Sequence, residues 1–384
     1  MTRQHLITTT SFIFGLLLAP SSVAIEFADE QLRLSGFATF SLSTSDNKTP
    51  YYPNRAIDDE RCYDCDATVG LQLDFQAHKN IQLSAQVVKR PEDDYSHPAI
   101  EWLYADWQAT DLFSLRLGRL RTPTYMTSEY YYVGNAYPWV RPTSEVYSRQ
   151  LGVTSYDGIE LRYLWQPNDQ INISFRPFFS PHNSTDIDLI KQRWNVRYDD
   201  LIGGVIELEA ENLTLRYHHS ETTVGIDVEF TASNTFVQYP DFSYKNDTVG
   251  AIYTLDNIDF WAEYQRDRDY DSFYIATVWH LNDFSPYINY AEGRDTALHQ
   301  KASRSLTLGL RYELPYKISL NLEGTRSENL ITPQGIMSAP RGQFVYSNWA
   351  FVNSPSTDDP AAGDWVENTS STVNILTLAL NWNF

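Results

Sequence analysis

Apolar and polar residues alternate along most of this chain, which is the pattern of a β-strand with one apolar and one polar face. Between residues 32 and 43 the even-numbered positions are mostly apolar and the odd-numbered ones mostly polar. The same alternation returns around residues 69–76, 81–88, 113–118 and 159–165. A helical spacing never replaces it, so the sequence predicts an all-β protein.

The connections between the predicted strands fall into two length classes. Short links with turn-forming residues lie at 78–80, 109–111, 166–169, 211–212, 256–257, 282–283 and 315–316. The other connections are mostly longer and polar, at 44–66, 91–98, 119–155, 180–200, 220–246, 267–271, 291–304 and 326–370. Short links form tight hairpin turns. The predicted sheet therefore has one short rim and one long rim.

About sixteen antiparallel strands of roughly ten residues, with short turns at one end and long loops at the other, are typical of a transmembrane β-barrel. Closure follows because a sheet in hydrocarbon cannot leave an edge of unpaired backbone groups. A soluble β-sandwich also alternates, but it buries its apolar face and needs no systematically short rim. We expect a barrel whose apolar faces meet lipid, with the sandwich as the alternative.

The last predicted strand ends on an aromatic residue. Leu376, Leu378, Leu380, Trp382 and Phe384 share one face of it. A terminal ring suits a membrane interface. The strand also resembles the C-terminal segment that the barrel-assembly machinery of Gram-negative bacteria reads, which implies that this machinery is a partner through Phe384.

The N-terminus predicts export. Arg3 precedes a mostly apolar stretch at residues 6–19, and Ser22 and Ala24 place small residues where a signal peptidase reads them. We expect cleavage after Ala24, so that residues 1–24 are a signal peptide and residues 25–384 form the barrel in the outer membrane. An uncleaved anchor is the alternative, but the stretch is too short and acidic residues follow closely.

Charge narrows the range of partners. The chain has 29 Lys and Arg against 49 Asp and Glu, a formal net charge of −20. Binding to nucleic acid needs a cation excess, so we expect no nucleic-acid partner. After the first two dozen residues, no apolar run approaches the roughly 18 residues of a membrane-spanning helix. Aromatic residues make up 14% of the chain, which suits strands and membrane interfaces.

The chain has two cysteines, Cys62 and Cys65. Export to an oxidising compartment favours a disulfide between them. A zinc site would need two further ligands, and a redox CxxC motif would need a βαβ context; the sequence offers neither nearby. We expect a disulfide that closes a small ring in the first long loop, with no bound metal and no cofactor.

The segment after the fifth predicted strand carries the most specific motif. It reads Gly118-Arg119-Leu120-Arg121-Thr122-Pro123 and continues through Glu129, Arg141 and Glu145. This resembles the start of the third loop in phosphate-selective-type porins and their uncharacterised proteobacterial relatives. In that family the third loop folds inward and narrows a water-filled pore, and the barrels form homotrimers. The resemblance implies that Arg119 and Arg121 stand where the loop begins, with the other three charges within it.

The same segment favours burial on its own composition. Large side chains crowd it, at Tyr125, Met126, Tyr130, Tyr131, Tyr132, Tyr137, Trp139 and Tyr147. So many rings are costly to leave on a solvated surface, which indicates that they pack against a wall. That wall is the barrel interior in our interpretation; the alternative is an outer rim or a neighbouring subunit.

Four arginines, Arg116, Arg162, Arg176 and Arg216, fall on the polar faces of predicted strands. They would form a basic wall of the lumen, opposed across the constriction by Glu129 and Glu145 of an inward loop. In the alternative, each arginine pairs with an inward acid such as Glu160, and these pairs only neutralise charges of the barrel wall. The sequence leaves both interpretations open.

These features predict a porin that lets small hydrophilic solutes or ions diffuse through a water-filled channel. The predicted fifth outer loop, 220–246, has one lysine against four acidic residues, unlike the lysine-rich phosphate-selective porins, so phosphate selectivity is not expected. A carbohydrate-selective porin is an alternative, because stacked rings suit sugars. We expect membrane lipid and lipopolysaccharide as further partners.

A barrel that does not conduct is the other alternative, acting as an adhesin, a structural protein or an enzyme. His218-His219-Ser220 has the H-x-S spacing of outer-membrane phospholipase, where nucleophile and base share a strand face. The Asn-Gly that follows this motif in the phospholipase is missing here. We therefore expect no catalytic residues.

Overall fold

The computed structural model describes residues 25–27, 31–47, 55, 57–91, 98–148, 154–189, 192–230, 235–268, 270–296, 299–329, 349–352, 364–367 and 372–384. The expected signal peptide and its cleavage site lie outside these residues. Most of the last long segment, 326–370, also lies outside them. Its described part includes a small separate hairpin of β17 (Trp349–Val352) and β18 (Asp364–Glu367).

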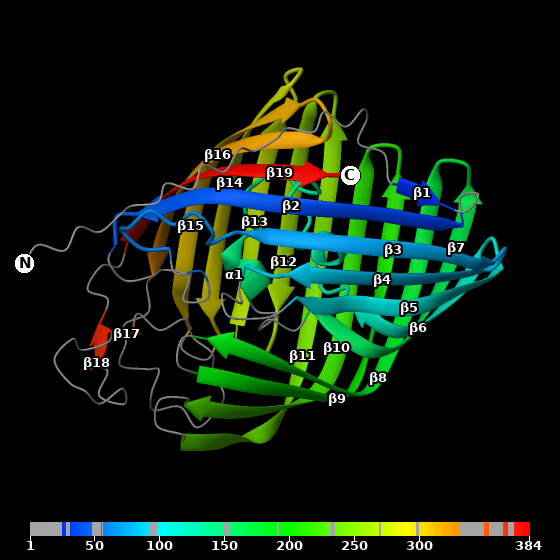
Figure 1. Ribbon diagram of the computed structural model, residues 1–384, viewed down its shortest axis with the longest axis horizontal. Coiled ribbons are helices and arrows are strands. Elements are labelled where there is room, and N and C mark those ends of the chain that lie inside the picture. The colour runs from blue at the N-terminus through cyan, green and yellow to red at the C-terminus, as the bar shows by residue number, and fades with distance from the viewer. Residues whose placement is uncertain are drawn as a thin grey trace, which may run out of the picture.

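Sixteen antiparallel strands among the described residues form one closed barrel (Figure 1). Each strand pairs with its neighbours along the chain, and β19 pairs with both β16 and β2, which closes the sheet. This confirms the expected all-β transmembrane barrel. The strands are β2 (Leu32–Ser45), β3 (Thr68–His78), β4 (Ile81–Lys89), β5 (Ala99–Thr110), β6 (Phe113–Arg121), β7 (Ser155–Asn168), β8 (Ile171–Leu189), β9 (Gln192–Ala210), β10 (Leu213–Phe230), β11 (Thr235–Leu255), β12 (Ile258–Arg266), β13 (Tyr270–Trp279), β14 (Phe284–Asp295), β15 (Gln300–Leu314), β16 (Ile318–Asn329) and β19 (Thr372–Asn383).

The barrel exposes apolar side chains on its outside and buries polar ones on its inside. On β19, Leu376 is 55% exposed, whereas its neighbour Thr377 is 1% exposed. On the adjoining β16, Leu322 is exposed and Asn321 is fully buried. A soluble sandwich has the opposite arrangement, so that alternative is wrong.

The C-terminus forms part of the seam between the first and last barrel strands. The Phe384 N–H donates to the Gly36 carbonyl at 3.0 Å, and the Gly36 N–H donates to the Phe384 carbonyl at 3.1 Å. A Cβ atom at Gly36 would lie 2.6 Å from the Phe384 ring, so a glycine is needed there. Next to this point, β1 (Ile25–Phe27) pairs with β2.

Strands β8–β11 are longer than the sequence led us to expect. They run for 18 to 21 residues each, so the prediction of long loops at 180–200 and 220–246 is wrong and most of those residues are strand. Val196, Val224, Ile226 and Val228 are at most 1% exposed and form a common cluster. This buried cluster stabilises the extended hairpins, because each apolar side chain removed from water contributes about 1.5–3 kcal/mol.

Candidate functional site

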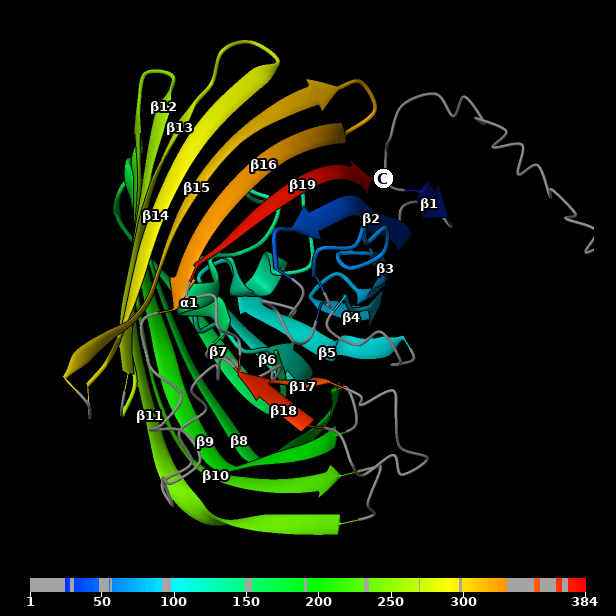
Figure 2. The same ribbon diagram turned by 90° about the vertical axis from the view of Figure 1, so that its left-hand side faces the viewer.

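The third loop, residues 122–154 between β6 and β7, lies inside the barrel where it is described. It contains two short helices, η1 (Ser128–Tyr130) and α1 (Ser144–Tyr147), and both views place α1 within the ring of strands (Figures 1 and 2). No helix among the described residues is long and apolar enough to cross a membrane. The expectation of a loop folded into the lumen is confirmed.

Aromatic side chains of the loop pack against the inner wall of the barrel. Trp139 is 2% exposed and makes edge-on contacts with Trp261 of β12 and Tyr274 of β13, at centroid distances of 5.3 and 5.7 Å. Tyr125 and Tyr147 are also buried and lie 4.6 Å apart between ring centroids. This packing accounts for the excess of rings in the loop, because burial of large rings is strongly favourable.

Polar side chains of the same wall, on β12 and β16, form hydrogen bonds with the loop. Glu263 of β12 accepts a 2.8 Å hydrogen bond from the Met126 N–H and a 2.9 Å bond from the Tyr147 hydroxyl. Glu323 of β16 accepts a 2.9 Å bond from the Val140 N–H. Sequence reasoning missed both glutamates. The available signal was their position on the polar face of a predicted strand, but many other polar residues share it.

Arginine of β15 also holds the loop. The Arg311 guanidinium donates to the Tyr137 carbonyl at 2.9 Å and to the Asn135 side-chain oxygen at 3.0 Å. The Asn321 amide of β16 donates to the Pro138 carbonyl at 2.6 Å. Each bond satisfies a backbone or side-chain group that has left water, so the strands facing β6–β8 form a docking wall for the loop.

Glu129 of η1 reaches the other wall, where it meets three arginines. Its Oε1 accepts bonds from Arg176 Nη1 of β8 at 2.9 Å and from Arg162 Nη2 of β7 at 3.3 Å. Its Oε2 lies 3.7 Å from Arg216 Nη1 of β10. Burial alone would raise the pKa of Glu129, but the three guanidinium groups outweigh it and hold that pKa well below its usual range. Glu129 is thus an anion at neutral pH.

Arg116 completes this group of charges, which we call the arginine cluster (Arg116, Arg162, Arg176 and Arg216). Arg116 donates to Asp106 at 2.7 Å and lies 3.9 Å from Glu160, and Arg162 donates to Glu160 at 2.6 Å. The structure therefore combines both interpretations of these arginines. Glu129 contacts Arg162, Arg176 and Arg216 from the loop, which meets the first interpretation in part. Acids of the wall pair with the arginines, as the second interpretation requires.

A cavity of about 480 Å³ lies beside the arginine cluster, toward the short-turn end of the barrel. Arg162 and Arg176 line it, together with inward carboxylates and amides such as Asp106, Glu207, Gln82 and Gln108. We call this cavity the vestibule. Its polar lining suits hydrated solutes and ions rather than apolar ligands.

Arg141 lies away from the arginine cluster and ties the third loop to the first loop, residues 46–67. Its guanidinium donates to both carboxylate oxygens of Asp66, at 2.6 and 2.5 Å. Asp66 is buried, which opposes ionisation, but Arg141 and Arg55 hold the pKa of Asp66 well below its usual range. This buried ion pair therefore holds the third loop to the first.

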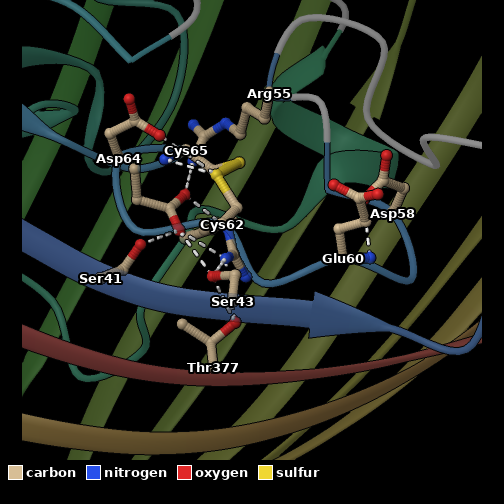
Figure 3. The surroundings of a disulfide bond; sticks show 11 residues. Ser41, Ser43, Arg55, Asp58, Glu60, Cys62, Asp64, Cys65 and Thr377 are labelled. Carbon is tan, nitrogen blue, oxygen red and sulfur yellow. Dashed lines mark hydrogen bonds and ion pairs between the residues drawn. A yellow bond between two sulfur atoms is a disulfide. The ribbon is translucent and has the colours of Figure 1, made fainter. Parts of the chain in front are cut away.

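Cys62 and Cys65 of the first loop are joined in a disulfide with a Cα–Cα distance of 5.8 Å (Figure 3). The backbone of Cys62 exchanges two hydrogen bonds with Ser43 of β2, at 2.8 and 2.9 Å. Ser41 and Ser43 also donate to Asp66, at 2.8 and 3.2 Å. The disulfide thus lies next to the ion pair between the first and third loops.

Four charges that we expected at the constriction lie elsewhere, namely Arg141, which is described above, and three others. Arg119 shares the outward face of β6 with Leu117 and pairs with Asp157 at 2.8 Å. Arg121 pairs with Glu101 at 2.7 Å where the loop begins. Glu145 is buried in α1, where burial raises its carboxyl pKa and the Ser144 hydroxyl donates to it at 3.1 Å. The two-residue period of β6 explains the position of Arg119, because Arg116 points inward.

The histidine and serine of the H-x-S motif do not form a hydrogen-bonded pair in the structure. His218 stacks on the Phe178 ring at a centroid distance of 6.0 Å, and neither of its ring nitrogens has a hydrogen-bond partner among the described residues. His219 instead pairs with Asp247 at 2.8 Å. A nucleophile needs a base within hydrogen-bonding reach, which this geometry does not provide.

Comparison with known proteins identifies similarity at the level of the fold. No protein-family model matches the chain, and no curated protein matches it in sequence. Among solved structures, OmpF of Salmonella typhi in complex with daunomycin has a TM-score of 0.58 at 11% identity, covering 94% of this chain and 100% of that chain. An anion-selective porin from Comamonas acidovorans has a TM-score of 0.56 at 12% identity, covering 92% and 99%. The trimer form of OmpT, an outer membrane protein of Vibrio cholerae, has a TM-score of 0.55 at 10% identity, covering 92% and 99%. The chain therefore has the fold of the outer-membrane porins.

Proposed function

We propose that this protein is a porin of the Gram-negative outer membrane, through which small hydrophilic solutes or ions diffuse passively. The proposal is supported by a group of charges inside the barrel: Glu129 of the inward loop contacts three arginines of the wall, beside the polar vestibule. We infer that these charges form the constriction of the channel. A lumen that served only as a packed core would not need this many charges, because burying ions is costly.

The constriction favours polar solutes and disfavours bulky apolar ones. Fixed charges of both signs that line a lumen create a local field that orients dipoles. The arginine cluster is matched by Glu129, Asp106, Glu160 and Glu207, so we propose weak rather than strong charge selectivity. The proposed function involves no catalytic step and no cofactor.

We propose the following position in the membrane and route of assembly for the barrel. The exposed apolar belt fits the membrane interior, the long loops face the cell exterior, and the signal peptide is removed after Ala24. We also propose that Phe384 is read by the barrel-assembly machinery and that the barrel assembles as a homotrimer; the trimer form of an outer-membrane protein with this fold supports the latter.

Liposome swelling tests the transport proposal. Purified protein is inserted into liposomes, which are diluted into isotonic solutions of neutral sugars of increasing size. We expect swelling that slows as the sugar grows, since the third loop narrows the lumen. Folded protein that gives no swelling with the smallest sugar would refute free solute diffusion and favour a barrel that does not conduct sugars.

A further inference from the structure

The vestibule has one guanidinium edge without a hydrogen-bond partner. Arg176 of β8 lines this cavity, and its side chain is only 7% exposed. Its Nη1 donates to Glu129 at 2.9 Å. Its Nε and Nη2 atoms are buried and have no hydrogen-bond partner among the described residues. Because Nε and Nη2 lie on the same edge of the guanidinium plane, together they can donate two parallel hydrogen bonds to one carboxylate.

A buried edge of this kind points to an acceptor that comes from outside the chain. A buried donor without an acceptor loses its hydrogen bonds to water, and the loss is larger for a charged group. Arg162, the second arginine that lines the vestibule, already donates to Glu129 and Glu160. The unfilled donors of the cavity wall therefore belong to Arg176.

Two glutamates of β9 line the same cavity on the lumen face. Val205 is the β9 residue opposite Arg176, so Glu207 and Glu209 lie two and four residues farther toward the short turns. Glu207 also lies 3.4 Å from Arg216. Glu209 is exposed and has no ion-pair partner among the described residues. The donor edge on β8 is thus followed by two carboxylates on the neighbouring strand.

The other charges that line the vestibule are balanced. Asp106 accepts a 2.7 Å hydrogen bond from Arg116. Lys79 and Asp111, one charge of each sign, lie in the turns at the rim. Most of the remaining lining residues carry amide or hydroxyl groups. The volume of about 480 Å³ lies within the usual range of ligand sites, about 300–1,000 Å³.

We propose that the vestibule binds small zwitterionic solutes, of the amino-acid and short-peptide class. The solute carboxylate accepts two hydrogen bonds from the free edge of Arg176, and the solute ammonium group binds Glu207 or Glu209. This deepens the proposed function and rests on it in one respect, namely that solutes enter the lumen. A zwitterion is favoured because a carboxylate alone leaves the glutamates unused, and an amine alone leaves the guanidinium edge unfilled.

The test measures binding to purified full-length protein in detergent by saturation-transfer NMR titration. The main probe is glycylglycine at neutral pH. N-acetylglycine keeps only the carboxylate, glycylglycinamide keeps only the ammonium group, and N-acetylglycinamide has neither charge. We expect glycylglycine to bind about threefold more tightly than N-acetylglycine, since exposed carboxylates pair weakly. It should bind about tenfold more tightly than glycylglycinamide, which cannot fill the guanidinium edge.

Two variants separate the two ends of the site. Arg176→Lys keeps a positive charge beside Glu129 but removes the two-donor edge, so it should weaken glycylglycine and N-acetylglycine about tenfold. Glu207→Gln with Glu209→Gln should abolish the preference for glycylglycine over N-acetylglycine. Glu211→Gln is the matched control, because Glu211 is an exposed acid of the next turn that does not line the vestibule; it should leave all four affinities unchanged.

Three outcomes would overturn the proposal. The first is equal binding of glycylglycine and N-acetylglycinamide by the wild type. The second is unchanged binding in Arg176→Lys, which would mean that water fills the guanidinium edge. The third is an equal effect of Glu211→Gln and of the double glutamate variant, which would mean a general effect of charge at this end. Single-channel recording of the same samples separates the two proposals: a barrel that conducts without this preference refutes only the binding site, and one that binds without conducting refutes only transport.

Discussion

Glu129 of the third loop and Arg176 of β8 form a hydrogen-bonded ion pair, with 2.9 Å between Oε1 and Nη1. The loop is bound to the opposite wall by Glu263 and Glu323, so this pair connects the two sides of the lumen. If the barrel conducts as proposed, we expect a solute that passes the third loop to meet these charges. We therefore expect these charges to set the ion selectivity of the channel.

Replacing Glu129 by Gln should shift the channel toward anions. The substitution removes the one loop carboxylate that faces Arg162, Arg176 and Arg216, and the three guanidinium groups keep their charge. The zero-current potential in a potassium chloride gradient should move toward the value for chloride. Loss of the charged hydrogen bonds should also lower the free energy of unfolding by about 1.5–3 kcal/mol.

Glu145→Gln is the matched control for that substitution. Glu145 belongs to the same loop but is buried in α1, away from the arginine cluster. Its replacement should leave the zero-current potential unchanged. Equal shifts in the two variants would mean that the effect comes from the loop as a whole and not from the Glu129 contacts.

Replacing Arg116 and Arg162 together by Ala should shift the channel toward cations. The double variant leaves Glu160 and Asp106 without their arginine partners on the wall. The shift of the zero-current potential should persist at high salt, since a Debye length of about 3 Å at 1 M still leaves close charges unscreened for a passing ion. An unchanged potential would remove these two arginines from the ion path.

The contribution of Glu129 and Asp66 to stability should be constant from about pH 8 to pH 5 and fall only below about pH 4. Neighbouring arginines lower the pKa of Glu129 and of Asp66 in the folded protein. Carboxyls with a depressed folded pKa contribute stability above their unfolded values of about 4.3 and 3.9, and lose it as the pH falls toward the folded pKa. Thermal unfolding followed by circular dichroism checks this. Glu129→Gln and Asp66→Asn should each make the acid-side fall shallower, and an equally steep fall in these variants and in the wild type would contradict the prediction.

The barrel was predictable from the sequence because its signal is repeated many times. Each strand places apolar side chains on lipid and polar ones in the lumen, as Leu376 and Thr377 do on β19, and this period survives local errors. The lengths of β8–β11 were not predictable, because strand extensions beyond the membrane contain many polar residues. Only the three-dimensional structure places Val224 and Val196 in one cluster.

The site was predictable in part. The motif beginning at Gly118 located the inward loop, and Glu129 lies against the arginines that the strand period turned inward. Ion pairs between the loop and a distant strand have no local sequence signal, since Glu129 and Arg216 are separated by 87 positions in the sequence. For the same reason the sequence placed Glu145 at the constriction and gave no indication of the contacts of Glu263.

Replacing Cys62 and Cys65 by Ser should leave the barrel assembled. The disulfide closes a ring over a sequence separation of three, and so small a ring removes little entropy from the unfolded chain, at or below about 3 kcal/mol of stabilisation. Arg141 and Asp66 still hold the first loop to the third. Surface expression and conductance near wild-type levels are expected; collapse of surface expression would show that the pair is needed for assembly.

Single-channel recording of the purified wild-type protein in a planar lipid bilayer shows whether the barrel conducts. A water-filled lumen with a charged constriction should give stepwise increases in current as single barrels insert, with the two selectivity shifts described above in the Glu129 and arginine variants. Protein that is folded by circular dichroism, inserts into the bilayer and gives no current steps would mean that the barrel is not a water-filled channel.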